Sequence, residues 1–339
     1  MTRPLVFLLL FHLSTSVFGQ ESDNPGGTKV AEVTRAGQKL IDTLDETQRA
    51  KLIFDFDDSE QRRRWSNLPS GIYERKGIRW GDLNDKQKEA VFALLRTTLS
   101  KRGFQQIVDN MEGDEILNRP GPRRRVVFGR DEYFVSLLGT PSNERPWMWQ
   151  FGGHHLAINV TIYQDKITLS PSLTGGQPVD YELNGRKVRQ LAGEEDKCFE
   201  LIASFNPNQL KTAVLDDDHA DMIFGPGKEG SKPSQEGICA ADLSDSQREL
   251  LLQLIEKRIG ILNNVHAKPV MRQISKDIDE TWFAWFGPTK PGSASSFRIQ
   301  APTILMEYAP QHLGGDATNH THAMYRDPTN DYGAQYLKK

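Results

Sequence analysis

Histidines are the residues of this 339-residue chain whose type and spacing point most directly to chemistry. The chain contains eight of them, of which His12 lies in an apolar N-terminal segment. His219 and His266 lie in polar, helix-rich segments, where we expect ordinary surface residues. The other five fall in two regions of strand-like sequence: His154, His155, His312, His320 and His322. Because neutral imidazole is a common ligand of Zn, Cu and Fe, this distribution makes a metal centre the first hypothesis.

The pair His154-His155 stands inside an apolar segment, Trp149 to Ile162, which we predict to be one β-strand. Neighbouring side chains of a strand point to opposite faces. His154 would share its face with the apolar residues and be a satisfied core histidine. His155 would share the other face with small and polar residues, which makes it the functional candidate. A bulge at Gly152-Gly153 would exchange the two assignments.

The motif His320-Thr-His322, if it lies on a strand, places both imidazoles on one face and presents two nitrogen ligands to one metal ion. A polar run follows it, in which Arg326 and Asp327 are candidates for anchoring a substrate or orienting the histidines. The alternative is a turn built from Asp-Pro and Asn-Asp, with Arg326 bridging carboxylates. The sequence leaves both interpretations open.

Glu307 stands in an otherwise apolar strand, Thr303 to Tyr308. Burying an unpaired carboxylate is costly, so this side chain needs a partner. His155, Arg298 or a metal ion could serve. Glu307 is therefore either a fourth ligand or general base, or one half of a structural ion pair with Arg298.

Together these residues predict a metal-dependent extracytoplasmic enzyme, a hydrolase or an oxidoreductase acting on a small molecule or a peptide. The ion would be a divalent transition metal (Zn, Cu or Fe), its ligands would be His155, His320 and His322, and the catalytic groups would be Glu307, Arg326 and Asp327. The competing hypothesis is a non-catalytic ligand-binding protein, whose aromatic cleft would be formed by Trp147, Trp149, Trp282 and Trp285. The motifs GxSxG, HExxH, GxGxxG and the P-loop are absent from the sequence.

An internal repeat indicates how these residues are positioned. The ten residues from Asp82 match those from Asp242, 160 residues later, at five of ten positions. Both segments begin with the spacing of a helix N-terminal capping box, Asn84 with Gln87 and Ser244 with Gln247, and continue with apolar residues at helical spacing. The segment from Asp131 likewise matches the one from Asp279, 148 residues later, and both are typical of strands.

Each copy therefore has helices first and a β-hairpin afterwards. We expect an α+β fold with an antiparallel sheet, in which two repeats, 35–185 and 186–339, pack as one pseudo-symmetric body with the site toward the C-terminal end. In this alignment His155 falls opposite Thr303. The segment Ser170 to Pro178 is expected to be a loop that forms a rim or lid.

The first residues, 1–19, have the charge, short apolar run and small residues of a secretory signal peptide, and 20–34 is polar enough for a flexible leader. We expect a secreted or periplasmic protein with no transmembrane segment in its mature chain. The net charge of −3, without a basic stripe, argues against nucleic acid as the main partner. Cys198 and Cys239 either form a disulfide or remain free thiols.

The chain also resembles a bacterial family known as domain of unknown function 3500. The resemblance rests on five groups of residues: Arg64-Trp65 with Pro69, Arg75-Lys-Gly77, Trp147-x-Trp149-x-Phe-Gly-Gly-His-His-Leu156, Ile304-Leu-Met-Glu-Tyr308, and His320-x-His322 with Tyr325-Arg-Asp-Pro-Thr-Asn-Asp-Tyr-Gly333. It covers nearly all of the mature chain. It implies one coherent folded unit and no established substrate, so the functional interpretation rests on the residues themselves.

Overall fold

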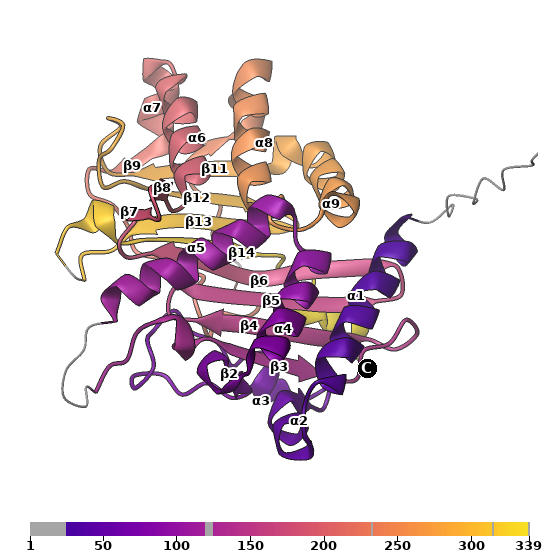
Figure 1. The fold of residues 1–339 in the computed structure, drawn as a ribbon. Helices are drawn as coiled ribbons and strands as arrows, with labels where there is room; N and C mark the ends of the chain where they lie inside the picture. The colour runs from indigo at the N-terminus through magenta and orange to yellow at the C-terminus, as the bar shows by residue number, and fades with distance from the viewer. Residues whose placement is uncertain (1–24, 119–124, 232, 314, 338–339) are drawn as a thin grey trace, which may run out of the picture.

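A large, mostly antiparallel sheet runs through the protein and carries the candidate residues (Figure 1). The structure is a computed structural model that describes residues 25–118, 125–231, 233–313 and 315–337. The strands follow the order β1-β3-β4-β5-β6-β14-β13-β12-β11-β10, with β2 beside β3 and β9 beside β11. Their bounds are β1 (Ile53–Phe54), β2 (Ile78–Arg79), β3 (Phe134–Leu138), β4 (Trp147–Gly153), β5 (Leu156–Tyr163), β6 (Lys166–Gly176), β9 (Val214–Asp216), β10 (Ile238–Cys239), β11 (Trp282–Phe286), β12 (Ser296–Ala301), β13 (Ile304–Pro310) and β14 (Thr321–Arg326).

A separate hairpin, β7 (Asp180–Leu183) and β8 (Arg186–Arg189), follows the end of β6. The α-helices are α1 (Pro25–Asp42), α2 (Glu46–Leu52), α3 (Ser59–Arg62), α4 (Asp85–Thr98), α5 (Lys101–Leu117), α6 (Ala192–Ala203), α7 (Pro207–Ala213), α8 (Asp245–Ile259) and α9 (Asn264–Lys276). Short 3-10 helices are η1 (Trp80–Asp82), η2 (Arg130–Glu132), η3 (Ala240–Asp242), η4 (Ile278–Glu280), η5 (Ala317–Asn319) and η6 (Asp331–Tyr336). Among the described residues, no helix is both long and apolar enough to cross a bilayer.

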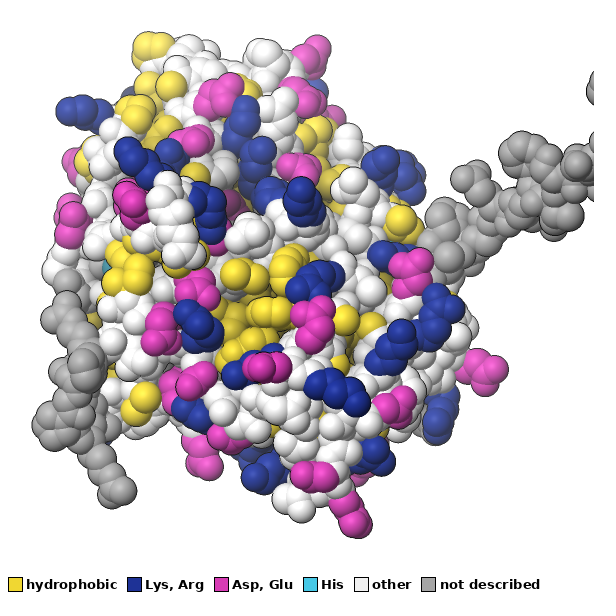
Figure 2. Space-filling view, viewed as in Figure 1, with side chains coloured by type: hydrophobic (Ala, Val, Ile, Leu, Met, Phe, Trp, Pro, Cys, Tyr) yellow, Lys and Arg dark blue, Asp and Glu magenta, His cyan; other side chains and the backbone are white. Residues whose placement is uncertain are grey.

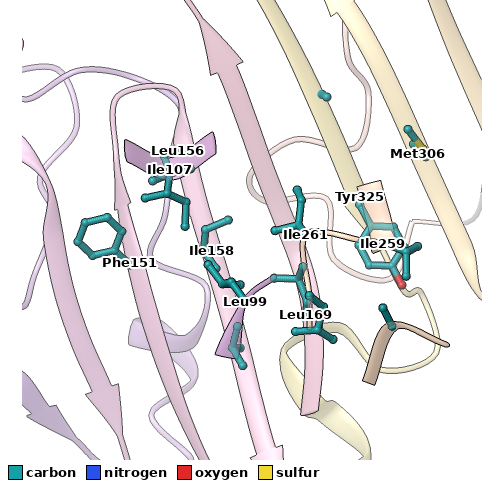
Figure 3. Packing of buried hydrophobic residues seen from close by; sticks show 14 of the residues in the cluster. Leu99, Ile107, Phe151, Leu156, Ile158, Leu169, Ile259, Ile261, Met306 and Tyr325 are labelled. Carbon is teal, nitrogen blue, oxygen red and sulfur yellow. The ribbon is translucent and has the colours of Figure 1, made fainter. Parts of the chain in front are cut away.

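The longer helices cover one face of the sheet (Figure 1). Side chains alternate along each strand, so that Trp147 and Trp149 of β4 enter the core beneath the helices while Met148 faces the other way. Figure 3 shows residues of this core from the helices beside strand residues: Ile107 lies by Leu156, and Ile259 lies by Tyr325. Figure 2 shows further hydrophobic side chains gathered in the middle of the helix-covered face, surrounded by charged residues.

The opposite face of the sheet is covered largely by segments outside the long helices. A second, smaller core there joins strand residues such as Leu173 and Met324 to Trp65, Phe224 and Tyr332. Trp65 donates its indole N–H to the Tyr332 hydroxyl over 2.6 Å. The polar C-terminal segment is therefore packed onto the sheet.

The two helices predicted from capping boxes are confirmed. The Asn84 side chain caps α4 and the Ser244 side chain caps α8, and in both boxes the glutamine side chain returns to the backbone of the capping residue. Gln87 also donates to Gln48 over 2.8 Å, which fixes α4 to the beginning of α2.

The expected α+β class is confirmed as a mixed fold with a large, mostly antiparallel sheet, but three local predictions are wrong. Trp149 to Ile162 is not one strand, because a turn at His154-His155 separates β4 from β5. The expected loop from Ser170 to Pro178 largely belongs to β6. The expected flexible leader, 20–34, overlaps α1 from Pro25 onward, because Val30 and Val33 lie on the buried side of that helix.

The predicted signal peptide, 1–19, lies outside the described residues. Cys198 in α6 and Cys239 in β10 are free thiols, so the disulfide alternative is not realised.

The centre of the sheet joins the first and second parts of the chain. β6 and β14 run antiparallel, with Gly175 opposite His322 and Gly176 opposite Thr321. On its other side β6 pairs with β5, and the register places Leu156 opposite Thr174. The turn between β4 and β5 therefore lies next to the beginning of β14, although the two are far apart in sequence.

Candidate metal centre

His155 occupies the second position of the tight turn between β4 and β5. Its backbone is left-handed, with φ of +59°, an uncommon conformation for a residue with a side chain. The turn is held on both sides, since the Gly175 N–H donates to the His155 carbonyl over 2.7 Å and the Tyr133 hydroxyl donates to the His154 carbonyl over 2.9 Å. Arg75 adds a third contact, donating to the Gly153 carbonyl over 2.8 Å. The surrounding contacts thus compensate for the strained backbone and fix the imidazole.

His320 and His322 lie at the beginning of β14. His320 precedes the strand with an extended backbone, φ −143° and ψ 101°, and its ring is 5.0 Å from that of His322 between centroids. The two-residue period of an extended chain places both side chains on the same side, as the sequence predicted.

The three histidines converge. The candidate ligand atoms of His155, His320 and His322 all lie within 4.8 Å of one another, and the three residues are buried. The Nε2 atoms of His155 and His320 are 2.9 Å apart, and the His155 and His322 ring centroids are 4.9 Å apart. In the described part of the chain, the cluster consists of these imidazoles alone, without a carboxylate or thiolate.

The histidine cluster depends on a glycine on the neighbouring strand. A Cβ at Gly175 would come within 2.5 Å of His322 Cδ2, 2.8 Å of the Thr321 carbonyl and 3.2 Å of His155 Cβ. Only a residue without a side chain therefore leaves room for these two imidazoles. Gly175 is not recognisable from the sequence as part of the site, because the prolines and glycines of 170–178 are typical of a loop.

The hydrogen bond made by His320 defines its tautomer. Its Nδ1 lies 2.5 Å from the Leu313 carbonyl, which can only accept, so Nδ1 carries the proton. In the neutral ring Nε2 then has a free lone pair. A backbone carbonyl on the remote nitrogen of a histidine is a common support for a metal ligand.

Burial keeps the cluster neutral. Loss of solvent lowers the pKa of His155 well below its ordinary value, and the rings of His154, His322 and His320 lower the pKa further. The pKa of His322 is lowered well below its ordinary value for the same first reason, and that of His320 is also lowered by burial. Neutral imidazole is the form that binds metal.

His322 provides the observation that tests whether a metal fits. Neither of its ring nitrogens has a hydrogen-bond partner, although both are buried. Leaving such a group unsatisfied costs about 1–3 kcal/mol. Tetrahedral Zn–N bonds of about 2.0–2.1 Å place ligand nitrogens about 3.3 Å apart, between the 2.9 Å and 4.8 Å found here. The residues present therefore fit a first-row transition metal after small side-chain shifts.

His154 packs against His155 and helps to fix the position of its ring. Its ring lies on that of His155, with centroids 3.6 Å apart, and its Nδ1 is 2.6 Å from Asp114 Oδ1 of α5. The other oxygen of Asp114 accepts the Gly129 N–H over 2.9 Å. The expectation of a satisfied, buried His154 agrees with this geometry. Asp114 lies in α5, 40 residues from His154 in sequence, and no local pattern marks it as a partner of that histidine.

Glu307 is placed outside the cluster. Its carboxylate accepts the backbone N–H groups of Ile223 and Phe224, and Arg298 Nε donates to it over 3.0 Å. Burial raises its pKa, against the lowering effect of these donors. The structure thus contains the ion pair with Arg298 that the sequence offered as the alternative, and the carboxylate fixes the segment at 223–224 to β13.

Arg326 and Asp327 are also separate from the histidines. Arg326 is buried, pairs with Asp331 over 2.7 Å and donates to the carbonyl of Phe224 over 2.7 Å. The structure therefore contains the ion pair between Arg326 and a carboxylate that the sequence offered as the alternative to a catalytic role. Asp327 accepts from Thr329 in a turn and lines a cavity at the far end of β14.

The aromatic cleft of the competing hypothesis is wrong in its proposed form. Trp147, Trp149 and Trp285 are fully buried in the main core and offer no open surface to a ligand. Trp282 of β11 is partly exposed, so the four indoles do not form a shared cleft.

Comparison with known proteins places the chain in one family. The model of the family described as "Protein of unknown function (DUF3500)" matches residues 26–334, nearly the whole chain, so the protein belongs to this family. No curated protein and no solved structure matches the chain.

Proposed function

We propose that this member of the DUF3500 family is a metal-binding protein, with a divalent transition-metal ion held by His155, His320 and His322. The single observation that supports this most strongly is the burial of three imidazoles around one point, with both nitrogens of His322 left unpartnered. Zn, Cu and Fe are the metals that three nitrogen ligands favour.

A metal-dependent hydrolase or oxidoreductase is the activity that such a ligand set supports. Three protein ligands leave a position open, at which the ion would supply Lewis acidity or, for Cu or Fe, redox chemistry. The chain's own contribution is orientation. The Leu313 carbonyl fixes the proton of His320, and the ring of His154, held by Asp114, lies against His155.

A purely structural ion is the second candidate, and the burial of the triad favours it. Such an ion would join the β4–β5 turn to β14 and so link segments that are 165 residues apart. Closed sites are typical of structural metals.

We further propose that the chain arose by duplication of a unit close to 35–185 and 186–339. The elements α1-α2-β1-β2-η1-α4-α5-η2-β3-β4-β5-β6 recur in the same order as α6-α7-β9-β10-η3-α8-α9-η4-β11-β12-β13-β14. The two series meet at the β6–β14 pair. The triad then takes one ligand from the first unit and two from the second. Export through the N-terminal segment, to the periplasm or outside the cell, completes the proposal.

The test is elemental analysis of full-length mature protein purified without a metal-affinity tag. We expect close to one equivalent of Zn, Cu or Fe per chain, and a large loss in His320→Ala and in His322→Ala. His219→Ala is the matched control, because His219 lies outside the cluster and should leave the metal content unchanged. Equal metal contents in all variants would contradict the proposal.

Replacement by cobalt distinguishes the two roles. Co(II) bound by three imidazoles with an exchangeable fourth position should change its visible spectrum when azide is added. A Co(II) spectrum that azide leaves unchanged assigns the ion to the structural role.

A further inference from the structure

A cavity of about 770 Å³ lies at the end of the central strands opposite to the triad. It is formed by α9, the beginning of β6, the end of β14 and the turn between β12 and β13. Because β6 and β14 are antiparallel, Lys166 and Asp327 mark this end, whereas Gly175 and His322 mark the other. A volume of this size is in the range that holds a small organic molecule.

Positive charge dominates the mouth of this cavity. Lys166, Lys268 and Arg272 line it, are exposed, and form no ion pair within the described part of the chain. The lining also contains two carboxylates, Asp165 and Asp327, so the cationic side chains outnumber the acidic ones by three to two. Asp327 accepts hydrogen bonds from the backbone N–H and the hydroxyl of Thr329. Three unpaired cations at one opening favour an anionic ligand.

The interior offers apolar surface and one unsatisfied polar group. Ile167 and Val270 line the cavity together with the rings of Tyr325 and Tyr336. His266 also lines it, is only 6% exposed, and its Nε2 has no hydrogen-bond partner. A buried nitrogen of this kind needs a partner, and a ligand in the cavity can supply one.

We propose that this cavity binds an organic carboxylate with an apolar or aromatic body. The carboxylate lies at the mouth against Lys166, Lys268 and Arg272. The apolar or aromatic part of the ligand lies between α9 and the ends of β6 and β14. There a polar substituent of the ligand contacts His266 Nε2. Thr303, which aligns with His155, lines this cavity, and His266 is the single imidazole among the lining residues. The cavity therefore binds its ligand without the metal centre, at the opposite end of the same strands.

The probes that test this proposal are three compounds with the same ring system and different charge: 2-naphthoate, 2-naphthalenemethanol and 2-naphthylmethylamine. Isothermal titration of the full mature chain measures their affinities. We expect 2-naphthoate to bind at least about tenfold more tightly than the alcohol, because its carboxylate can contact two or more of the cationic side chains. The amine should bind most weakly, because the same side chains repel it.

Lys166→Glu is the informative variant. Lys268 and Arg272 also line a neighbouring groove between α8 and α9, whereas Lys166 does not. Lys166→Glu should weaken 2-naphthoate about fivefold or more. Lys211→Glu, the same change at an exposed lysine of α7, should leave the affinity unchanged. Far-ultraviolet circular dichroism and metal content serve to show that both variants fold and that the metal centre is unaffected.

Three results would overturn the proposal. The first is tighter binding of the amine than of 2-naphthoate. The second is an equal effect of Lys166→Glu and Lys211→Glu. The third is no binding of any probe at millimolar concentration.

Discussion

The Nε2 atoms of His155 and His320 lie 2.9 Å apart, although 165 residues separate the two histidines in the chain. The β6–β14 pair produces this proximity, because it places the β4–β5 turn beside the beginning of β14. Two lone pairs cannot approach so closely without a proton or a metal ion between them.

Gly175→Ala should disturb the cluster directly. The added Cβ would meet His322 Cδ2 at 2.5 Å and a backbone carbonyl at 2.8 Å, so His322 must move. We expect a loss of metal affinity of about 10–100-fold, comparable to the loss of a ligand-supporting contact. Competition with a chromogenic chelator measures it. Gly193→Ala is the control, because the Cβ there meets only the flexible Lys257 side chain, at 3.1 Å. Equal affinities of the two variants would contradict the packing argument.

Asp114→Ala should lower the free energy of unfolding by about 2–4 kcal/mol, because it leaves the buried His154 and the Gly129 N–H without their acceptor. Asp114→Asn, which keeps an acceptor oxygen, should cost less. Urea denaturation of the metal-free protein measures both. Asp217→Ala, at an exposed aspartate, should change the free energy by less than about 0.5 kcal/mol. If Asp114→Ala leaves the free energy of unfolding unchanged, the contact between Asp114 and His154 does not stabilise the fold.

Glu307→Ala should destabilise the fold by about 3 kcal/mol and leave the metal content unchanged. The substitution removes the buried partner of Arg298 and the acceptor for two backbone N–H groups. Denaturation and elemental analysis of the same sample separate the two effects. Loss of metal without loss of stability would instead assign Glu307 to the metal centre.

His266 should make the protein less stable in acid. Burial lowers its pKa to about 4 in the folded protein, against an ordinary value of 6.5 for histidine. Protonation therefore favours the unfolded chain, so its contribution to stability is full above pH 6.5 and is lost as the pH falls toward 4. His266→Gln should flatten the fall of the melting temperature across this interval. If the melting temperatures of the two proteins fall in parallel between pH 6.5 and pH 4, the acid sensitivity does not come from His266.

Three kinds of signal in the sequence were sufficient to predict parts of this structure. Capping residues report local backbone geometry, so Asn84 and Ser244 predicted the beginnings of α4 and α8 correctly. The His320-x-His322 spacing predicted two imidazoles on one side, because the period of an extended chain is independent of the rest of the fold. The need for a partner at Glu307 followed from the cost of an unpaired buried charge. The sequence left Arg298, His155 and a metal ion as alternatives, and Arg298 is the partner in the structure.

Other parts depend on tertiary contacts that no local pattern encodes. The turn at His154-His155 lacks an Asn-Gly or Asp-Gly signal, and its left-handed histidine is held by Gly175, Tyr133 and Arg75 from elsewhere in the chain. β6 contains one proline and two glycines, which are typical of loops, yet two neighbouring strands hold it in the sheet. His266 was expected at the surface because its neighbours are polar, but its own side chain is buried.

X-ray absorption spectroscopy of the metal-loaded protein tests the central claim most directly. The extended fine structure at the edge of the bound metal should show three imidazole nitrogens at about 2.0–2.1 Å, and His322→Ala should reduce their number or abolish binding. A shell of oxygens without imidazole scattering, or a spectrum that His322→Ala leaves unchanged, would contradict a metal centre built from His155, His320 and His322.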